Sequence, residues 1–163
     1  EAPKPEECGQ VRPFDVNGSA EAGAGRFNTD GTFGEEFYSC ETGVRRIIRG
    51  EFSLSHDKEL GTQGMLTGTL QRERMVSDDH LAGYFLGAYA SQTSVTSRAN
   101  GEINGFGLYG GLYGAARMEQ DIYLDYYLAG SAGYHTFDLR FSDDLSEDIN
   151  ADGSYQYLGL FGG

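Results

Sequence analysis

Hydrophobic and polar residues alternate along most of the chain, and the alternation is clearest from Ile103 to Phe141. One run covers residues 103–117, a polar break follows at residues 118–120, and a second run covers residues 121–137. Successive side chains of a β-strand leave opposite sides of the backbone, so a period of two predicts strands. Two such runs joined by a short polar break predict a hairpin, around which we expect the rest of the chain to be organised.

The two faces of this hairpin differ in character. One face is apolar: Phe106, Leu108, Leu112 and Ala116 in the first run, and Ile122, Leu124, Tyr126, Leu128 and Ala132 in the second. The other carries Gly105, Gly107, Tyr109, Gly111, Tyr113 and Arg117, then Asp121, Asp125, Ser131 and His135. In a membrane-spanning barrel the apolar set faces lipid, whereas Asp125, Ser131 and His135 face a polar lumen. In a soluble sheet the apolar set is instead the buried core.

Further alternating runs predict strands at residues 11–27, 33–40, 44–54, 61–75, 81–95 and 154–161. In the first of them, Phe14 and Val16 are expected on one face, opposite Asp15 and Asn17. Turns are expected at residues 28–31, 42–43, 56–59, 76–80 and 99–102, and an acidic loop at residues 142–153. The pair Asn100-Gly101 is a strong hairpin signal because both residues adopt positive φ readily. The sequence therefore predicts an all-β fold, a sequential antiparallel meander of about eight long strands that forms a β-barrel or part of one.

The strands of the central hairpin are long and rich in tyrosine and glycine. Membrane-spanning β-strands need ~9–11 alternating residues, whereas ordinary strands have ~5–6. This length favours a membrane barrel over a soluble sandwich, in which the alternation would look the same.

Composition narrows the possible functions. The chain has 163 residues, which we divide into an N-terminal tail (residues 1–10) and one β domain (residues 11–163). The formal net charge of −13 argues against binding to nucleic acid. No apolar run is long enough for a transmembrane helix, so any membrane span must consist of strands. The N-terminus has no methionine and is expected to be a mature end left by signal-peptide removal, although a chosen boundary would look identical.

Two cysteines, Cys8 and Cys40, are the only ones in the chain. Their even number, wide separation and lack of a nearby histidine cluster predict a disulfide, the alternative being two buried thiols. A disulfide here would contribute about 3 kcal/mol by restricting the unfolded chain, and it implies an oxidising compartment.

The only basic cluster contains Arg45, Arg46 and Arg49. One interpretation is a set of interior arginines that face carboxylates such as Asp121 and Asp125. The interpretation we favour is a solvated strand face with local ion pairs, each worth little.

Three segments carry a family resemblance: Leu81 to Tyr89, Tyr109 to Arg117, and Ile122 to Tyr134. Their alternating glycine and aromatic residues resemble the translocator domain of bacterial autotransporters, best over residues 70–141. The resemblance implies an outer-membrane β-barrel of a Gram-negative bacterium, with about twelve strands, a passenger polypeptide and no cofactor.

The chain departs from that family in length and in its last residues. It is shorter than such a barrel requires, and two glycines follow the final aromatic residue, Phe161. It is therefore expected to be a fragment, a shortened relative, or a domain that closes by pairing with copies of itself.

Candidate chemistry is sparse. Asp148, Asn150 and Asp152, followed by Gly153, match the opening of a calcium loop, in which alternate oxygen ligands precede a sharp turn. The position of the closing bidentate glutamate holds Gly159, so a solvated acidic loop is the preferred interpretation. His56, His80 and His135 lie apart, and Ser131 is not in a nucleophile elbow.

We therefore expect a non-enzymatic protein for which no cofactor is required. The first hypothesis is an outer-membrane or cell-surface barrel for secretion or anchoring, whose partners are membrane lipid, a passenger polypeptide or copies of itself. The second is a secreted or surface-exposed structural subunit that self-associates through its strand edges.

Overall fold

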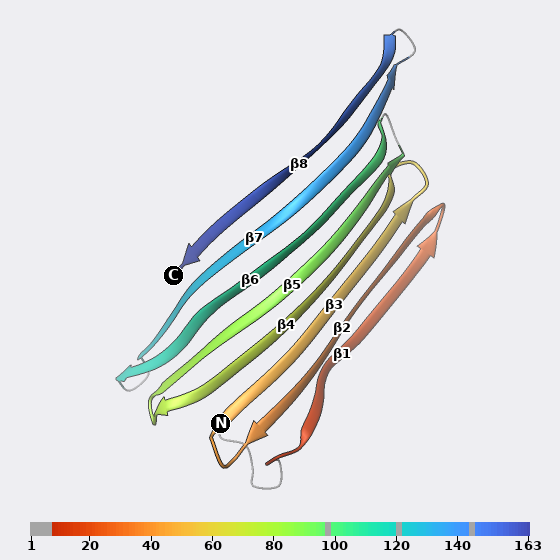
Figure 1. Cartoon of the computed structure of the whole chain (residues 1–163). Coiled ribbons are helices and arrows are strands. Elements are labelled where there is room, and N and C mark those ends of the chain that lie inside the picture. Colours follow the sequence, from red (N-terminus) through yellow and green to blue (C-terminus); the bar gives the residue numbers. More distant parts are fainter. Residues whose placement is uncertain (1–7, 97–98, 120–121, 144–145) are drawn as a thin grey trace.

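The computed structural model describes residues 8–96, 99–119, 122–143 and 146–163. The described chain forms one antiparallel sheet in which the eight strands follow one another in sequence order. Figure 1 shows them side by side in a single layer, with the start of β1 at the lower end. The strands are β1 (Val11–Gly23), β2 (Arg26–Ser39), β3 (Val44–Asp57), β4 (Gly61–Ser77), β5 (His80–Thr96), β6 (Ala99–Glu119), β7 (Ile122–Asp143) and β8 (Ser146–Gly162).

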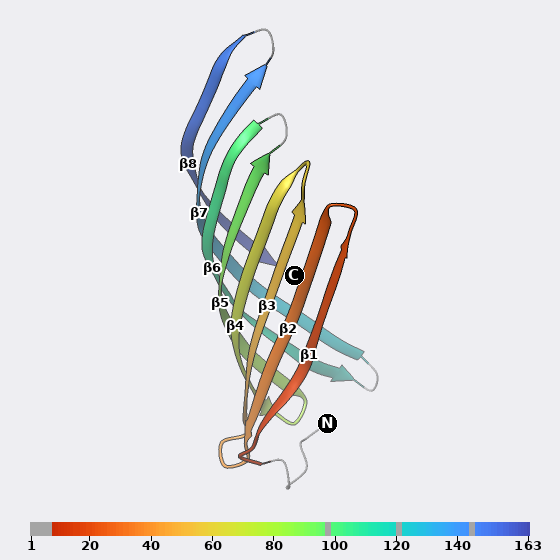
Figure 2. The same cartoon turned by 90° about the vertical axis from the view of Figure 1, so that its right-hand side faces the viewer.

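The expected meander of about eight strands is confirmed. Strand lengths run from 13 residues in β1 to 22 in β7, so the central hairpin is indeed formed by the longest strands. The sheet is open, because within the described residues β1 pairs only with β2, and β8 only with β7. Figure 2 shows that the layer is twisted and bent along the strands, so it encloses a concave side without closing into a barrel.

The first turn lies at Ala24 and Gly25 rather than at residues 28–31, where we expected it. Both residues have positive φ, 49° at Ala24 and 80° at Gly25, as a two-residue hairpin turn requires. Residues 28–31 continue strand β2 and pair with β1 and β3. The prediction was wrong because alanine seldom adopts positive φ, and Asp30-Gly31 therefore looked like the better turn.

The expected turn at Asn100 and Gly101 is also wrong. Both residues lie inside β6, where Gly101 pairs with Val95 on β5 and with Leu139 on β7. A Cβ at Gly101 would collide with the backbone carbonyl of Asp138. Glycine at this position therefore permits close packing between strands.

The acidic segment at residues 142–153 is not a loop. Strand β7 extends to Asp143 and β8 begins at Ser146, so most of the segment is paired backbone. Cross-strand hydrogen bonds to β7 outweigh the low strand propensity of the aspartates.

A bulge in β1 changes which of its residues share a face. Phe14 pairs with Gly34 and Asn17 pairs with Thr32, so one extra residue lies between them, and Asp15 has a φ of 51°. A bulge of this kind reverses the alternation. Phe14 consequently shares its face with Asn17, opposite to the expectation from strict alternation.

The sheet has almost no core of its own. Among the described residues, Val44 is the only buried hydrophobic side chain, with 5% of its surface exposed. A soluble domain of this size normally buries a continuous apolar core. Within the described residues, the single layer has no second layer packed against it.

Candidate functional site: the two faces of the sheet

The strand register defines two faces, because residues directly opposite each other on paired strands point to the same side. The apolar face consists of the even-numbered residues of β3 to β8 and the odd-numbered residues of β2. The hydrogen-bonded face consists of the remaining residues of these strands. The expected division of the central hairpin is confirmed, since Phe106, Leu112 and Leu128 share the first face and His135 lies on the second.

Large apolar side chains on the apolar face are exposed on every strand from β2 to β8. They are Phe27, Phe33, Ile48, Phe52, Leu54, Leu66, Leu70, Tyr84, Leu86, Phe106, Leu108, Leu112, Ile122, Leu124, Tyr126, Leu128, Leu158 and Leu160. No second layer of the described chain covers them. Soluble monomers rarely expose a contiguous apolar surface of this extent.

These side chains form a band that crosses the sheet diagonally, which we call the apolar band. On β7 the apolar positions of this face, small residues included, extend from Ile122 to Tyr134, so the middle of the band is Leu128, which pairs with Leu112 on β6. On β3 its middle is Gly50, between Ile48 and Phe52, and register pairs connect Gly50 through β4 and β5 to Leu108 on β6. Leu108 and Leu112 are four residues apart, so the band shifts by roughly one residue per strand between β3 and β7.

The hydrogen-bonded face is held together by tyrosines that lie across glycines of the neighbouring strand. A Cβ at Gly87 on β5 would collide with the ring of Tyr109 on β6, whose hydroxyl is 2.5 Å from Thr69 Oγ1 on β4. In the same way, the ring of Tyr113 lies over Gly83. Each of these tyrosines therefore connects two strands that are not direct neighbours.

A third example extends over four strands. Tyr89 on β5 lies over Gly107, and Tyr157 on β8 lies over Gly133, where the Tyr157 hydroxyl donates to the Tyr89 hydroxyl at 2.8 Å. His135 stacks on the ring of Tyr155, with centroids 4.8 Å apart, and its Nε2 is 3.0 Å from the Tyr89 hydroxyl. Side chains can meet over such a span when they lie on the concave side of a curved sheet. The hydrogen-bonded face is therefore the inner side of the curvature.

Charged groups on this face are paired. Arg45 donates to Glu36 through Nε at 2.9 Å and to Glu73 through Nη1 at 3.1 Å. Glu73, with 9% of its surface exposed, also accepts from the Tyr113 hydroxyl at 2.5 Å and from Gln71. A buried carboxylate is stable here because each of its oxygens has a donor.

The basic cluster is divided between the two faces. Arg45 and Arg49 lie on the hydrogen-bonded face, and Arg49 pairs with Asp15 at 3.6 Å, whereas Arg46 lies on the apolar face. Their partners belong to β1, β2 and β4, so the suggested pairing with Asp125 on β7 is wrong. Asp121 lies outside the described residues. The local ion pairs that we favoured are present.

At the upper end of the sheet, the turn after β3 is fixed by a carboxylate. The backbone N–H of Glu59 donates to Asp57 at 2.8 Å, and Arg26 Nε donates to the same carboxylate at 2.7 Å. These two bonds hold the pKa of the Asp57 carboxyl below its ordinary value.

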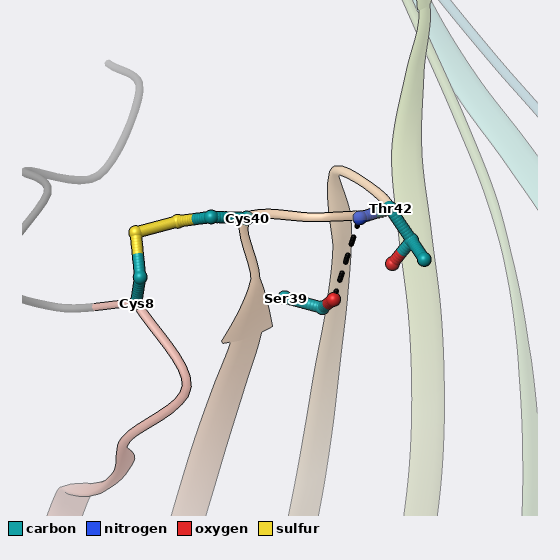
Figure 3. Close-up of a disulfide and its surroundings, with 4 residues drawn as sticks. All are labelled: Cys8, Ser39, Cys40 and Thr42. Carbon is teal, nitrogen blue, oxygen red and sulfur yellow. Dashed lines mark hydrogen bonds between the residues drawn. A yellow bond between two sulfur atoms is a disulfide. The ribbon is translucent and has the colours of Figure 1, made fainter.

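The predicted disulfide between Cys8 and Cys40 is present and lies at the lower end of the sheet, with a Cα–Cα distance of 5.5 Å. It connects the segment before β1 to the residue that follows β2 (Figure 3). Beside it, the backbone N–H of Thr42 donates to Ser39 Oγ at 3.4 Å. The N-terminal edge of the sheet is thereby tied to the β2–β3 hairpin.

The calcium candidate lies along strand β8. Asn150 and Asp152 occupy alternate positions of the apolar face, opposite Arg140 and Asp138 of β7. The side chain of Asp148 lies outside the described residues. The side chains that the structure describes include no group of three or more histidine, cysteine, aspartate or glutamate residues that could hold a metal. Calcium binding stays a prediction.

The sequence did not identify the tyrosine–glycine contacts, the pairing of Glu73, or the proximity of Arg72 to Arg46. All three depend on which residues of different strands lie opposite each other. The run of glycines and tyrosines was visible, but its pairs become recognisable only with the register.

No helix in the described part of the chain is long and apolar enough to cross a membrane. Comparisons with protein-family models, with curated proteins and with solved structures found no significant match to this chain. The functional argument therefore depends on the geometry of the two faces.

Proposed function

We propose that this chain is a non-enzymatic β-barrel component of an outer membrane or cell surface. Its apolar face lies against lipid, and its hydrogen-bonded face lines a polar interior. The observation that carries this proposal is the diagonal course of the apolar band across a sheet that has no core of its own.

The slope of the band supports this orientation. A shift of one residue, ~3.3 Å, per interstrand spacing of ~4.8 Å corresponds to a strand tilt of roughly 35°. Strands of membrane barrels tilt by ~35–45° from the membrane normal. An apolar band that is horizontal in the membrane would cross tilted strands with this slope.

The width of the band gives a second measure. On β6 the apolar side chains extend from Phe106 to Ala116, roughly 33 Å along the strand, or roughly 27 Å along the normal at that tilt. The apolar belt of outer-membrane barrels is ~25 Å tall. Polar residues follow at the upper end of the same face, beginning with Asn104 on β6 and Gln92 on β5.

The finer proposal is a translocator-like role, in secretion or surface anchoring, as the autotransporter resemblance implies. A barrel of this kind needs closure, because β1 and β8 have open edges. Those edges would pair with each other, with further strands or with another copy of the chain. Proteins of this type export or anchor a passenger polypeptide without a catalytic centre.

The open edges also favour a second candidate, a secreted or surface-exposed structural subunit that self-associates through strand pairing. Unpaired backbone groups along β1 and β8 are a template for adding strands. In that case a second protein layer, rather than lipid, would cover the apolar face.

Detergent dependence distinguishes the two candidates. The chain is purified in detergent, and its size and its circular dichroism are measured before and after the detergent is removed. The membrane proposal expects aggregation in buffer, and recovery of a monodisperse, strand-rich species in lipid vesicles. A defined, strand-rich oligomer that persists without detergent would overturn it in favour of the second candidate.

A further inference from the structure

Three arginines on the apolar face lie near one another toward the lower end of the sheet. Arg46 on β3 pairs directly with Arg72 on β4, and Arg74 follows two residues later on the same side. All three are exposed. Like charges directly opposite each other on paired strands repel and destabilise a sheet, so a bound anion would stabilise this arrangement.

The described chain supplies no such anion. None of its ion pairs involves Arg46, Arg72 or Arg74, whereas Arg12, Arg45 and Arg49 on the hydrogen-bonded face all bind carboxylates. Glu35 is the acidic residue of the apolar face nearest to Arg46, and it pairs with Ile48 rather than with Arg46. The excess charge at this place is therefore positive in a chain whose net charge is −13.

The depth of the three arginines follows from the apolar band. Arg46 and Arg72 are each four residues from the middle of the band, at Gly50 and Gly68, toward the lower end. At the tilt derived above, four residues correspond to roughly 10 Å along the membrane normal, and Arg74 lies a few ångströms farther out. Half of a hydrocarbon core is ~15 Å thick, so the backbone of Arg46 and Arg72 lies just inside the core. Their long side chains extend outward and bring the guanidinium groups to the level of the lipid headgroups.

A groove connects these arginines to the apolar band. It has a volume of 490 Å³ and is lined on the apolar face by Val11, Phe37, Ile48, Leu70 and Tyr84, together with Glu35, Arg46 and Arg72. An adjoining hollow of 340 Å³ shares Arg72 and Tyr84 and adds Arg74. An apolar floor with guanidinium groups at one end matches a molecule that has a hydrocarbon chain and an anionic head.

We propose that this groove binds an anionic glycerophospholipid from the leaflet at the end of the sheet that carries the disulfide. Arg46 and Arg72 hold the phosphate, Arg74 faces the rest of the headgroup, and an acyl chain lies along Ile48, Leu70 and Tyr84. Planar guanidinium groups bind phosphate through paired hydrogen bonds, and a phosphate between two arginines removes their repulsion. The proposal rests on the membrane function proposed above.

An anionic lipid suits the site better than a zwitterionic one. Three carboxylates line the groove and the adjoining hollow, but Glu36 and Glu73 are bound by Arg12 and Arg45 of the other face. Glu35 therefore stands against three arginines, and the site retains positive charge after one phosphate has bound. A phosphatidylcholine headgroup adds a cation, whereas phosphatidylglycerol adds none. Each basic side chain near a membrane surface favours anionic lipid by about 1 kcal/mol, roughly a fivefold change in affinity.

The test uses the absence of tryptophan from this chain. Tyr84→Trp places a single fluorophore in the groove, and Leu124→Trp places one on the same face two strands away, on β7. Each variant is inserted into phosphatidylcholine vesicles that contain a minor fraction of phosphatidylglycerol, with one or the other lipid brominated. The ratio of the two quenching constants gives the local preference for the anionic lipid.

At Tyr84→Trp we expect a preference for phosphatidylglycerol of roughly fivefold or more, which Arg46→Gln or Arg72→Gln lowers severalfold. Arg117→Gln removes the same charge from the opposite face of the lower end and should leave the ratio unchanged. At Leu124→Trp the ratio should be near one.

The outcomes separate the two proposals. If Tyr84→Trp shows equal quenching by both lipids, or a preference that survives Arg46→Gln and Arg72→Gln, the lipid site is wrong while the membrane function stands. A preference for brominated phosphatidylcholine over phosphatidylglycerol would also overturn the anionic assignment. If no brominated lipid quenches Leu124→Trp, the apolar face does not contact lipid. That result would overturn the proposed membrane function and, with it, the lipid site.

Discussion

The two faces of this sheet satisfy their polar groups in opposite ways. On the hydrogen-bonded face, Arg45 binds two carboxylates, and the buried Glu73 accepts hydrogen bonds from several side chains. On the apolar face, Arg46 and Arg72 face each other and form no ion pair with a carboxylate of the described residues, and the neighbouring Ile48 and Leu70 are exposed. The charged groups of one face find their partners within the chain, whereas Arg46 and Arg72 on the other face do not.

This difference indicates where the fold obtains its shape and where it obtains its stability. Tyrosines that span three or more strands on the inner face favour curvature, because they draw together strands that are not neighbours. The outer face contributes less within the chain, since most of its large apolar side chains remain exposed. Most of the hydrophobic free energy of this protein therefore becomes available only when lipid or another protein layer covers that face.

The largest expected effect comes from placing a charge in the apolar band. Leu112→Arg should lower the free energy of unfolding in lipid vesicles by about 2–4 kcal/mol, because an arginine near the bilayer midplane loses its hydration. Ser131→Arg, on the inner face, should change it far less. Denaturant titrations of the vesicle-inserted protein measure both, and Leu112→Ala corrects for the lost volume.

Equal costs for Leu112→Arg and Ser131→Arg would remove the distinction between the faces. A Leu112→Arg variant that is unaffected in buffer and remains strand-rich there would indicate that the apolar face is solvated.

The sequence predicted the hairpin, the number of strands and the division of β6 and β7 into two faces, since a period of two determines these directly. It placed the first turn at residues 28–31 instead of at Ala24 and Gly25, and it predicted a turn at residues 99–102, which lie in β6. Local turn propensity is weak compared with the pairing of long strands. It also missed the inner network, because Arg45, Glu73 and Tyr113 come from three different strands. Contacts of that kind depend on tertiary register and have no local pattern.

The second prediction concerns the buried carboxylate of the inner face. Glu73→Ala should destabilise the protein by about 1–3 kcal/mol, because Arg45, Tyr113 and Gln71 each lose an acceptor. Glu51→Ala removes an exposed glutamate of the same face, on β3, and should have an effect within about 0.5 kcal/mol. The same denaturant titration compares them. Similar values for both would mean that the network around Glu73 contributes no net stability.

The third prediction compares glycines on the two faces. Gly87→Ala should destabilise by about 1–3 kcal/mol, because the new Cβ displaces the Tyr109 ring. Gly68→Ala, on the apolar face, meets no atom within 4 Å and should be neutral or slightly stabilising, since alanine loses less backbone entropy than glycine. Thermal unfolding followed by circular dichroism orders the two variants. A reversed order would show that the tyrosine ring moves away without cost.

The smallest expected effect isolates one tyrosine hydroxyl. Tyr109→Phe should cost about 1 kcal/mol, because Thr69 Oγ1 loses its partner across the intervening strand, whereas Tyr84→Phe on the apolar face removes a hydroxyl that bonds to no other described residue. A double-mutant cycle of Tyr109→Phe with Thr69→Val measures the coupling, which should be about 0.5–1 kcal/mol. Because Tyr109 and Thr69 lie on β6 and β4, coupling of this size would mean that the inner face links strands beyond direct neighbours. Additive effects would mean that this hydrogen bond does not contribute to the curvature of the sheet. The two faces would then differ in how their charges are paired, and not in what they contribute to the shape.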